Sequence, residues 1–330
     1  MPKFNIECQN TVLKVQDLLN QNPEWKTRYE EYAEKIIADS KLIREMKQKF
    51  REWKPLFLYM NVTSAKSNLI FSLRYLGQDV AKLKVGSDKI TISTEGFGEK
   101  NLRDFKCEVN LNNCQWRSKE TKSFRNHFSD NPKRTKDSGK GNDEHRIESL
   151  LLSEFSKKSS EDKILCNIQP VKLAGITRFQ MPTSINASNI NKLEYSGSHG
   201  GGIDILSRIG TGGGVKLCIM EVKDTNNTQE TPAKAIQQGL AYATFIRELL
   251  RSNSGEAWWK LFGFNGKLPT QLKLYVACVM PSKNNNDISF TDQVVEVGKD
   301  NIRFHYLYYK ESENKFAEME TSLNECKYKP

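Results

Sequence analysis

The stretch of sequence that decides the fold runs from Gly200 to Lys223 and reads GGGIDILSRIGTGGGVKLCIMEVK. It contains two apolar runs, at residues 203–206 and 215–220, with a glycine-rich turn at residues 210–214 between them. Short β-branched runs on either side of a glycine cluster are typical of a β-hairpin. We therefore expect two paired strands here, joined by the glycines.

From Leu217 to Met220 the second strand of this hairpin is apolar on both faces, and the charged Glu221 and Lys223 follow at its carboxyl end. Because side chains alternate between faces, Glu221 and Lys223 are expected to point the same way. A strand that is apolar on both faces belongs inside a sheet that is covered on both sides. Asp204 lies on the first strand, with sixteen residues between it and Glu221, and is expected to meet Glu221 across the pair.

The set Asp204, Glu221 and Lys223 resembles the motif of the PD-(D/E)XK nucleases, the restriction-endonuclease-like superfamily. The proline that names the motif is absent, since Ile203 precedes Asp204. The resemblance covers roughly residues 143–280. It implies an α/β (α+β) fold with a mixed central sheet flanked by helices. It also implies hydrolysis of DNA phosphodiester bonds with Mg²⁺, for which Mn²⁺ substitutes, in an endonuclease of restriction, defence or repair.

The residue types suit this chemistry. The carboxylates of Asp204 and Glu221 and the main-chain carbonyl of Val222 are oxygen ligands, which Mg²⁺ prefers. The metal polarises a phosphate oxygen and lowers the pKa of a bound water, and Lys223 orients that water or stabilises the developing charge. The alternative is a surface hairpin with Glu221 and Lys223 in solvent, which the apolar run before them disfavours.

A helix is predicted ahead of the hairpin, from about residue 142 to 157, with Asn142 or Asp143 as its N-cap. Glu148 lies at the edge of the apolar stripe of this helix. Nucleases of the superfamily often take an extra acidic residue from such a helix, so the resemblance assigns Glu148 a catalytic, metal-binding role. Glu144 is the alternative, and a solvent-facing Glu148 also stays open.

A second helix is predicted after the hairpin, beginning at residues 231–232, Thr-Pro. Gln238 and Tyr242 lie one turn apart on it and resemble the Gln-x-x-x-Tyr motif of RecB-like nucleases. In that family the glutamine and tyrosine help to position the site and its DNA, which implies a catalytic role for Gln238 and DNA contact for Tyr242. Gln237 is the alternative to Gln238, and a half-buried helical pair without a catalytic role stays open.

Several basic side chains are candidates for phosphate contact. One lies in the first turn of the second helix, where main-chain amides also hold anions. His199 lies just before the glycines; the alternative is a loop histidine without a catalytic role. Three lie in a basic, polar segment, which either orders on a phosphate backbone or is a solvated interdomain loop. These residues are Lys234, His199, Arg125, Lys133 and Arg134.

Composition narrows the class of protein and the partner. The chain has 330 residues, 27% charged and 37% hydrophobic, and a formal net charge of +10. These proportions are typical of a soluble globular protein, and no apolar run approaches the ~20 residues of a membrane span. The positive excess favours a polyanion. We expect DNA, with RNA as the alternative, no membrane, and a homodimer left open.

The seven cysteines do not form a metal or disulfide pattern. Their number is odd, no Cys-x-x-Cys pair occurs, and Cys107 and Cys114 do not have a common zinc spacing. Cys166, Cys218 and Cys278 lie in apolar runs and are expected to be reduced core residues. This usage favours a cytoplasmic protein. No G-x-S-x-G, H-E-x-x-H or P-loop motif is present, which disfavours other hydrolases.

Three parts are predicted along the chain. Residues 1–117 form helices, from residue 11 to about 52 with a break at Pro23, and then an antiparallel β-meander. Residues 118–142 form a basic, polar linker. Residues 143–330 form the nuclease-like domain, in which a strand at 272–280 lies beside the Glu-x-Lys strand and the end of the chain is frayed. The alternative function is a nuclease-like module that binds nucleic acid or protein without cleavage.

Overall fold

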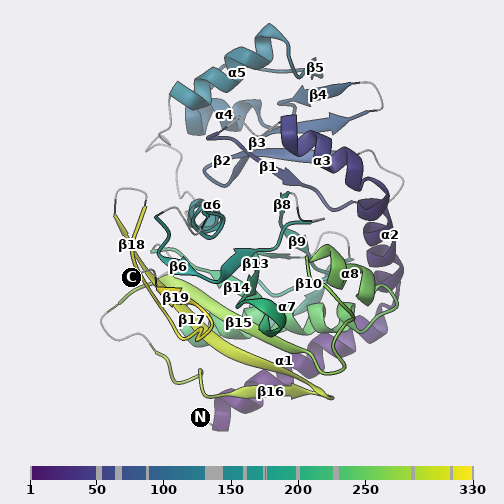
Figure 1. Cartoon of the computed structure of the whole chain (residues 1–330), viewed down its shortest axis with the longest axis vertical. Coiled ribbons are helices and arrows are strands. Elements are labelled where there is room, and N and C mark those ends of the chain that lie inside the picture. The colour runs from purple at the N-terminus through teal and green to yellow at the C-terminus, as the bar shows by residue number, and fades with distance from the viewer. Residues whose placement is uncertain are drawn as a thin grey trace. The chain divides into compact units, whose positions relative to one another are not determined.

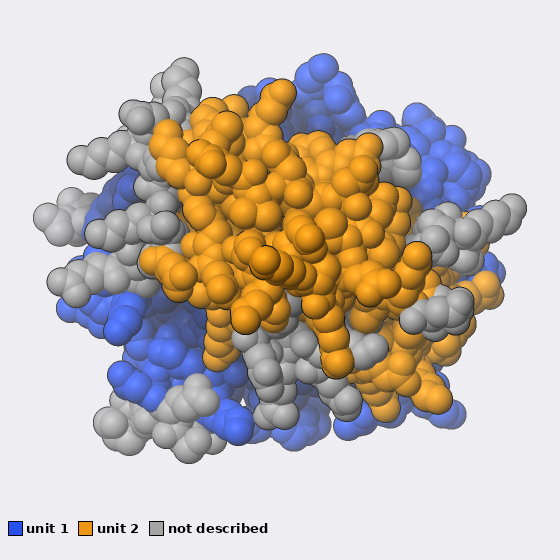
Figure 2. All heavy atoms as spheres, turned by 90° about the horizontal axis from the view of Figure 1, so that it is seen from above, with its two compact units in different colours: residues 1–30, 147–171, 180–330 blue, residues 31–146, 172–179 orange. Residues whose placement is uncertain are grey.

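The computed structural model describes residues 2–49, 54–63, 69–86, 89–130, 144–158, 162–173, 175, 177–197, 201–225, 230–283, 287–312 and 315–328. The fold is mixed α/β, as expected (Figure 1). Two compact units are present: residues 1–30, 147–171 and 180–330 form unit 1, and residues 31–146 and 172–179 form unit 2 (Figure 2). Within the described ranges, no helix combines the length and apolar character that a bilayer span requires.

Unit 1 contains a mixed sheet that includes the predicted hairpin. Strand β13 pairs antiparallel with both β14 and β7, whereas β14, β15 and β17 run parallel to one another. β16 and β18 pair antiparallel with β17. The strands are β7 (Ile168–Pro170), β13 (Ile205–Ile209), β14 (Lys216–Val222), β15 (Lys273–Pro281), β16 (Val294–Val297), β17 (Asp300–Ser312) and β18 (Lys315–Thr321).

The parallel pairing of β14 and β15 confirms the expected neighbour of the Glu-x-Lys strand. Parallel strands need a crossover, and here the crossover contains α7 (Pro232–Leu250) and α8 (Gly255–Leu261). α7 packs on β14 and β15 (Figure 1). Gly239 permits this close packing, because a Cβ at Gly239 would lie 2.5 Å from Val276 Cγ1.

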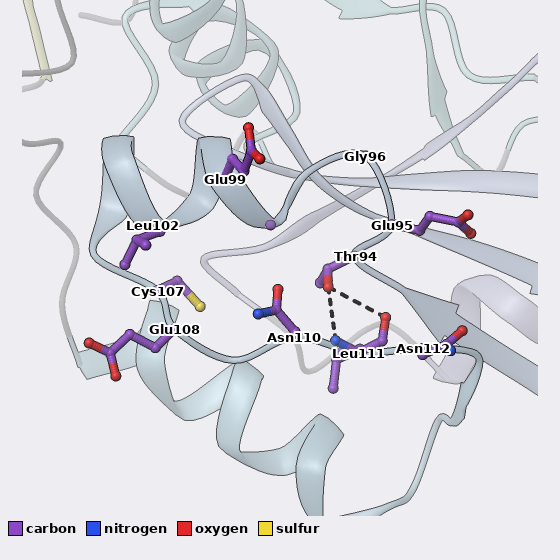
Figure 3. Close-up of a pocket in the computed structure, with 11 residues that line it drawn as sticks. Thr94, Glu95, Gly96, Glu99, Leu102, Cys107, Glu108, Asn110, Leu111 and Asn112 are labelled. Carbon is purple, nitrogen blue, oxygen red and sulfur yellow. Dashed lines mark hydrogen bonds between the residues drawn. The ribbon is translucent and has the colours of Figure 1, made fainter.

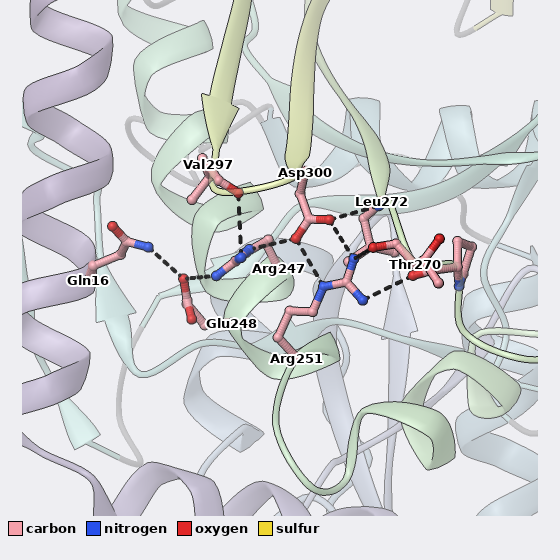
Figure 4. Close-up of polar contacts among 9 residues, drawn as sticks. Gln16, Arg247, Glu248, Arg251, Thr270, Leu272, Val297 and Asp300 are labelled. Atoms are coloured by element: carbon pink, nitrogen blue, oxygen red, sulfur yellow. Dashed lines mark hydrogen bonds and ion pairs between the residues drawn. The ribbon is translucent and has the colours of Figure 1, made fainter.

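The far end of α7 is joined to the sheet by a polar network (Figure 4). Asp300, at the start of β17, accepts hydrogen bonds from Arg247 Nε at 2.9 Å and from the Arg251 guanidinium. Glu248 bonds Gln16 of α1 (Pro2–Gln21) at 2.8 Å. These contacts tie α1, α7 and β17 together on the side of the helix away from the hairpin.

Short strands complete unit 1. β6 (Leu165–Cys166) pairs with β19 (Lys327–Tyr328), β9 (Met181–Pro182) with β12 (Gly202–Ile203), and β10 (Ile185–Asn186) with β11 (Glu194–Tyr195). The prediction of a frayed chain end is wrong, because β18 and β19 both pair with earlier strands. The short helix η1 (Ile190–Lys192) is capped by Asn189. All seven cysteines are free.

Unit 2 contains the predicted meander. The strands β1 (Phe57–Met60), β2 (Leu69–Tyr75), β3 (Gln78–Val85), β4 (Ile90–Ser93) and β5 (Cys114–Gln115) pair antiparallel in chain order. A later strand, β8 (Arg178–Phe179), adds parallel to β1 and was not predicted. Helix α4 (Gly98–Phe105) lies between β4 and β5 in the sequence.

The helices at the start of the chain extend further than predicted. α1 begins at Pro2 rather than at residue 11, the predicted break at Pro23 separates it from α2 (Glu24–Ala38), and α3 (Ser40–Lys49) follows. The prediction of a linker from residue 118 is also wrong in its first half, because α5 (Lys119–Asp130) is helical. Phe124 and Phe128, one turn apart, are fully buried and hold α5 in place.

Candidate active site at the carboxyl end of β14

The hairpin brings Asp204 to the carboxyl end of β14. Ile205 pairs with Met220, and continuation of this register by one step puts Asp204 opposite Glu221. Asp204 itself lies at a bend between β12 and β13. Its Oδ2 accepts a hydrogen bond of 2.8 Å from the Val222 N–H. The carboxylate of one strand is therefore fixed by the main chain of the next.

Glu221 and Lys223 form a buried ion pair. Lys223 Nζ lies 2.8 Å from Glu221 Oε1, and the two side chains are only 7% and 6% exposed. A second carboxylate oxygen, Glu230 Oε2, lies 3.3 Å from the same Nζ. The burial contradicts the alternative in which Glu221 and Lys223 are solvated. It also agrees with the expectation that both side chains leave the strand on the same face.

Helix α6 (Glu144–Phe155) adds a third carboxylate to the surroundings of Asp204. Glu148 is buried, with 5% of its surface exposed, so the solvent-facing alternative is wrong. Burial raises the pKa of Asp204 well above its ordinary value, and the negative charges of Glu221 and Glu148 raise that pKa further. Lys223 and the Val222 N–H oppose the shift without cancelling it. Mutual repulsion among three carboxylates is therefore only partly neutralised by the protein.

The oxygen donors of this site are of the chemical type that a hard divalent cation binds. The pKa of Asp204 is raised beside other carboxylates, and the oxygen ligands that magnesium prefers are available from Asp204, Glu221 and the Val222 carbonyl. Among the residues that the structure describes, no group of three or more His, Cys, Asp or Glu is close enough to hold a metal ion. Glu148 therefore acts on Asp204 through its charge, and the candidate ligands are two carboxylates and one main-chain carbonyl.

Helix α7 carries Gln238 and Tyr242, and Tyr242 lies within the electrostatic influence of the carboxylates. Both residues are buried, and Gln238 Nε2 donates a 3.0 Å hydrogen bond to the Ala187 carbonyl. Burial raises the pKa of Tyr242 far above its usual range, with further contributions from the charges of Glu221 and Asp204. Since the interaction between charges weakens with distance, the effect of both carboxylates on this pKa places the Tyr242 hydroxyl in their neighbourhood.

Glycines make room for these contacts. A Cβ at Gly201 would lie 2.5 Å from the Tyr242 hydroxyl oxygen, and a Cβ at Gly239 would lie 3.9 Å from Glu221 Cβ. Gly239 also separates the helix positions of Gln238 and Leu240. The Tyr242 hydroxyl therefore approaches Gly201 more closely than a side chain there would permit, whereas the helix lies at ordinary contact distance from Glu221.

Gln237 forms a hydrogen bond to a different element from the one that Gln238 contacts. Its Nε2 donates a 2.9 Å hydrogen bond to Glu7 Oε2 of α1. The adjacent Gln238 bonds Ala187 instead. The two glutamines point to different elements, which favours Gln238 over Gln237 as the residue of the Gln-x-x-x-Tyr motif.

Lys234 lies in the first turn of α7, as predicted. Thr231 is the N-cap, and its Oγ1 accepts from the Lys234 N–H at 3.3 Å. The exposed Lys234 lines a cavity of about 440 Å³ together with residues of α1 and η1, among them Lys14. This position is compatible with the expected contact to phosphate.

The other predicted phosphate contacts lie in unit 2 or outside the described residues. Arg125 lies on α5 of unit 2 and is half-buried, and burial lowers the pKa of its guanidinium. His199, Lys133 and Arg134 lie outside the described residues. Sequence reasoning missed Glu230, the second partner of Lys223; its only signal is its position directly before the N-cap Thr231.

A separate cavity of about 940 Å³ lies in unit 2 beside α4 (Figure 3). Its lining includes three acidic residues, Glu95, Glu99 and Glu108, and no basic residue. A hydrogen bond between Leu111 N–H and Thr94 Oγ1, at 2.8 Å, closes one wall. This negative lining disfavours phosphate, so the cavity does not take part in the site described above.

Comparison with known proteins found no match to this chain. No protein-family model matches the chain, and no similarity to a curated protein or to a solved structure was found. The geometry of unit 1 and its chemistry therefore carry the functional argument.

Proposed function

We propose that this chain hydrolyses phosphodiester bonds in DNA in a Mg²⁺-dependent reaction, and that unit 1 belongs to the restriction-endonuclease-like PD-(D/E)XK superfamily. The observation that carries the proposal is the convergence of Asp204, Glu221 and Lys223 at the buried carboxyl end of β14. Two buried carboxylates and a buried ammonium at one strand end are costly to the fold, and a catalytic role explains them.

The helices on either side of the hairpin support the same proposal. α6 precedes the Asp204 strand and brings the buried Glu148 near its carboxylate. α7 follows the Glu-x-Lys strand and brings Gln238 and Tyr242 toward the site. The order of these elements and the burial of these residues support the proposal.

Each residue has a chemical task in this proposal. When bound, the cation supplies polarisation of a phosphate oxygen and a water of lowered pKa. Asp204, Glu221 and the Val222 carbonyl would hold Mg²⁺, or Mn²⁺ in its place. Lys223, fixed by Glu221 and Glu230, stabilises negative charge that develops on the phosphate. Tyr242 keeps its proton because its pKa is raised, so its hydroxyl can donate a hydrogen bond.

The test is cleavage of plasmid, linear and single-stranded DNA, and of RNA, with Mg²⁺ and with chelator. We expect cleavage of DNA that needs Mg²⁺ and that Asp204→Ala and Lys223→Ala abolish. Glu296→Gln is the matched control, because Glu296 is an exposed carboxylate on β16 of the same sheet. Unchanged cleavage by either active-site variant would remove the assignment.

The second candidate is a nuclease-like module that holds nucleic acid without cutting it. One observation favours it: the described residues contain no cluster of three or more metal-ligating side chains. It predicts DNA binding that is equal in Mg²⁺ and in chelator and no cleavage of any substrate. The buried Lys223 has no task in such a module, which is why we prefer the enzyme.

A further inference from the structure

A second cleft lies in unit 1 at the amino ends of the parallel strands. It has a volume of about 680 Å³ and is lined by the first residues of β14 and β15, by the glycine-rich turn and by the segment after α8. The active-site candidates lie at the other end of β14. Six residue steps separate Lys216 from Val222, which is ~20 Å at the usual rise of a strand.

The charge of this cleft has one sign. Its lining contains four basic residues and no acidic residue: Arg208, Lys216, Lys267 and Lys273. Lys267 and Lys273 are exposed, and Lys216 is half-buried with its Nζ donating to the Gly214 carbonyl. Like charges gathered around a concave surface raise the local potential and attract a polyanion.

The floor of the cleft is rigid. Trp259 and Phe264 stack with ring centroids 3.8 Å apart, and both are buried. Arg208 spans the floor by donating to the Gly263 carbonyl and, at 2.8 Å, to Gln169 Oε1. Within the described part of the chain, two buried N–H groups here, Trp259 Nε1 and Arg208 Nε, have no acceptor. A buried donor without an acceptor is costly unless an ordered water accepts from it.

The rim of the cleft is open. A Cβ at Gly212 or Gly213 would meet no atom within 4 Å, so nothing stands over this part of the turn. The main chain there is accessible to a large ligand such as a strand of nucleic acid.

We propose that this cleft binds the phosphate backbone of a nucleic acid strand, away from the carboxylates at the other end of β14. The four cations supply the attraction, hydrogen bonds hold two of them, Arg208 and Lys216, in place, and the open rim lets a long strand pass. The proposal rests on the proposed function only for the identity of the polyanion. It adds a second contact region on the opposite end of the same pair of strands.

The test is binding of a fluorescein-labelled 20-nucleotide DNA, single-stranded and as a duplex, to the full chain in chelator by fluorescence anisotropy. The variant is Lys267→Gln with Lys273→Gln. The matched control is Lys315→Gln with Lys327→Gln, which removes the same charge from exposed positions on β18 and β19.

We expect the cleft variant to bind about tenfold more weakly than the control. Loss of two phosphate contacts also lowers the slope of log affinity against log salt by about 1.4 for the single strand and about 1.8 for the duplex. Equal losses in the two double variants, or no loss in the cleft variant, would overturn the proposal. Displacement of the DNA by millimolar ATP from the wild-type chain but not from the cleft variant would assign the cleft to a free nucleotide and overturn it too.

The outcome of this experiment can reject the cleft without rejecting the proposed function, and the reverse also holds. Binding is measured in chelator, so it does not need cleavage. A selective loss in the cleft variant, with no cleavage of any substrate, supports the cleft and rejects the enzyme. Mg²⁺-dependent cleavage with equal binding losses supports the enzyme and rejects the cleft.

Discussion

Asp204 Oδ2 and the Val222 N–H form a 2.8 Å hydrogen bond between neighbouring strands, at the end of the hairpin where the carboxylates gather. The bond positions a carboxylate whose pKa is raised by burial and by the charges of Glu221 and Glu148. Geometry and electrostatics are therefore opposed at one residue: the main chain holds Asp204 in a place where its negative charge is unfavourable. Such opposition is typical of active sites, where stability is given up for function.

The first prediction concerns Asp204→Asn. A carboxyl whose pKa is raised on folding binds more protons in the folded than in the unfolded state, so its contribution to stability falls as pH rises above the unfolded pKa near 3.8. Asparagine removes the charge and keeps an acceptor for the Val222 N–H. We expect the variant to be more stable than wild type at pH 8, by about 0.5–2 kcal/mol, and to lack cleavage. Urea unfolding at pH 8 and pH 5 measures the difference, which should shrink at the lower pH.

The control for this prediction is Glu296→Gln, which also removes a carboxylate but from an exposed position on β16. It should leave both the stability and its pH dependence within about 0.5 kcal/mol of wild type. A destabilised Asp204→Asn at pH 8 would contradict the raised pKa.

The second prediction concerns the Lys223–Glu221 ion pair. Lys223→Met leaves Glu221 and Glu230 without their buried cation, and breaking a buried pair costs about 3–5 kcal/mol. Adding Glu221→Gln to this variant removes one of the uncompensated charges. We therefore expect the double variant to recover part of the stability while cleavage stays absent. Thermal unfolding with a cleavage assay tests this, and a double variant as unstable as the sum of both singles would show that the two residues do not interact.

The third prediction uses the adjacent glutamines as a matched pair. Gln237→Ala removes the hydrogen bond to Glu7 of α1, so it should lower stability by about 1 kcal/mol and leave cleavage near wild type. Gln238→Ala removes the bond to Ala187 beside the site, and it should lower kcat by about 100-fold through misplacement of reacting groups. Unfolding and steady-state cleavage are measured on both. The reverse pattern would transfer the motif role to Gln237.

The hairpin and its surroundings could be predicted from the sequence because the signals are local. The glycine cluster at residues 210–214, the apolar run of β14 and the Thr231 cap each act over a few residues. α5 was missed because polar and basic residues and the following Asn131-Pro132 outweighed its signal. That signal was the pair Phe124 and Phe128, one helical turn apart and both buried in the structure.

Long-range contacts were not predictable by the same means. The parallel pairing of β8 with β1 joins segments more than a hundred residues apart, and neither segment carries a mark of its partner. Glu230 reaches Lys223 across a loop, where no periodicity applies. The burial of Glu148 could be proposed only from the resemblance, since its position at the edge of an apolar stripe fits both a buried and a solvated side chain.

The fourth prediction concerns Asp300, which joins α7 to β17 away from the site (Figure 4). Burial alone would raise the pKa of Asp300, but hydrogen bonds from Arg251, from the Leu272 N–H and from Arg247 outweigh it and lower the pKa below its ordinary value of 3.8. An acid whose folded pKa is lowered contributes stability that is present above the unfolded pKa and is lost as pH falls through the folded pKa. Asp300→Asn should therefore destabilise unit 1 at pH 7, by about 3–5 kcal/mol for a broken buried pair. The difference from wild type should shrink as the pH falls below about 3.8, the unfolded value.

Urea midpoints at pH 7, 5 and 3.5 measure this difference in stability. The control is Glu318→Gln, in an exposed pair with Lys310, which should change little at any pH. A difference that is independent of pH would mean that Asp300 acts through packing rather than through its charge.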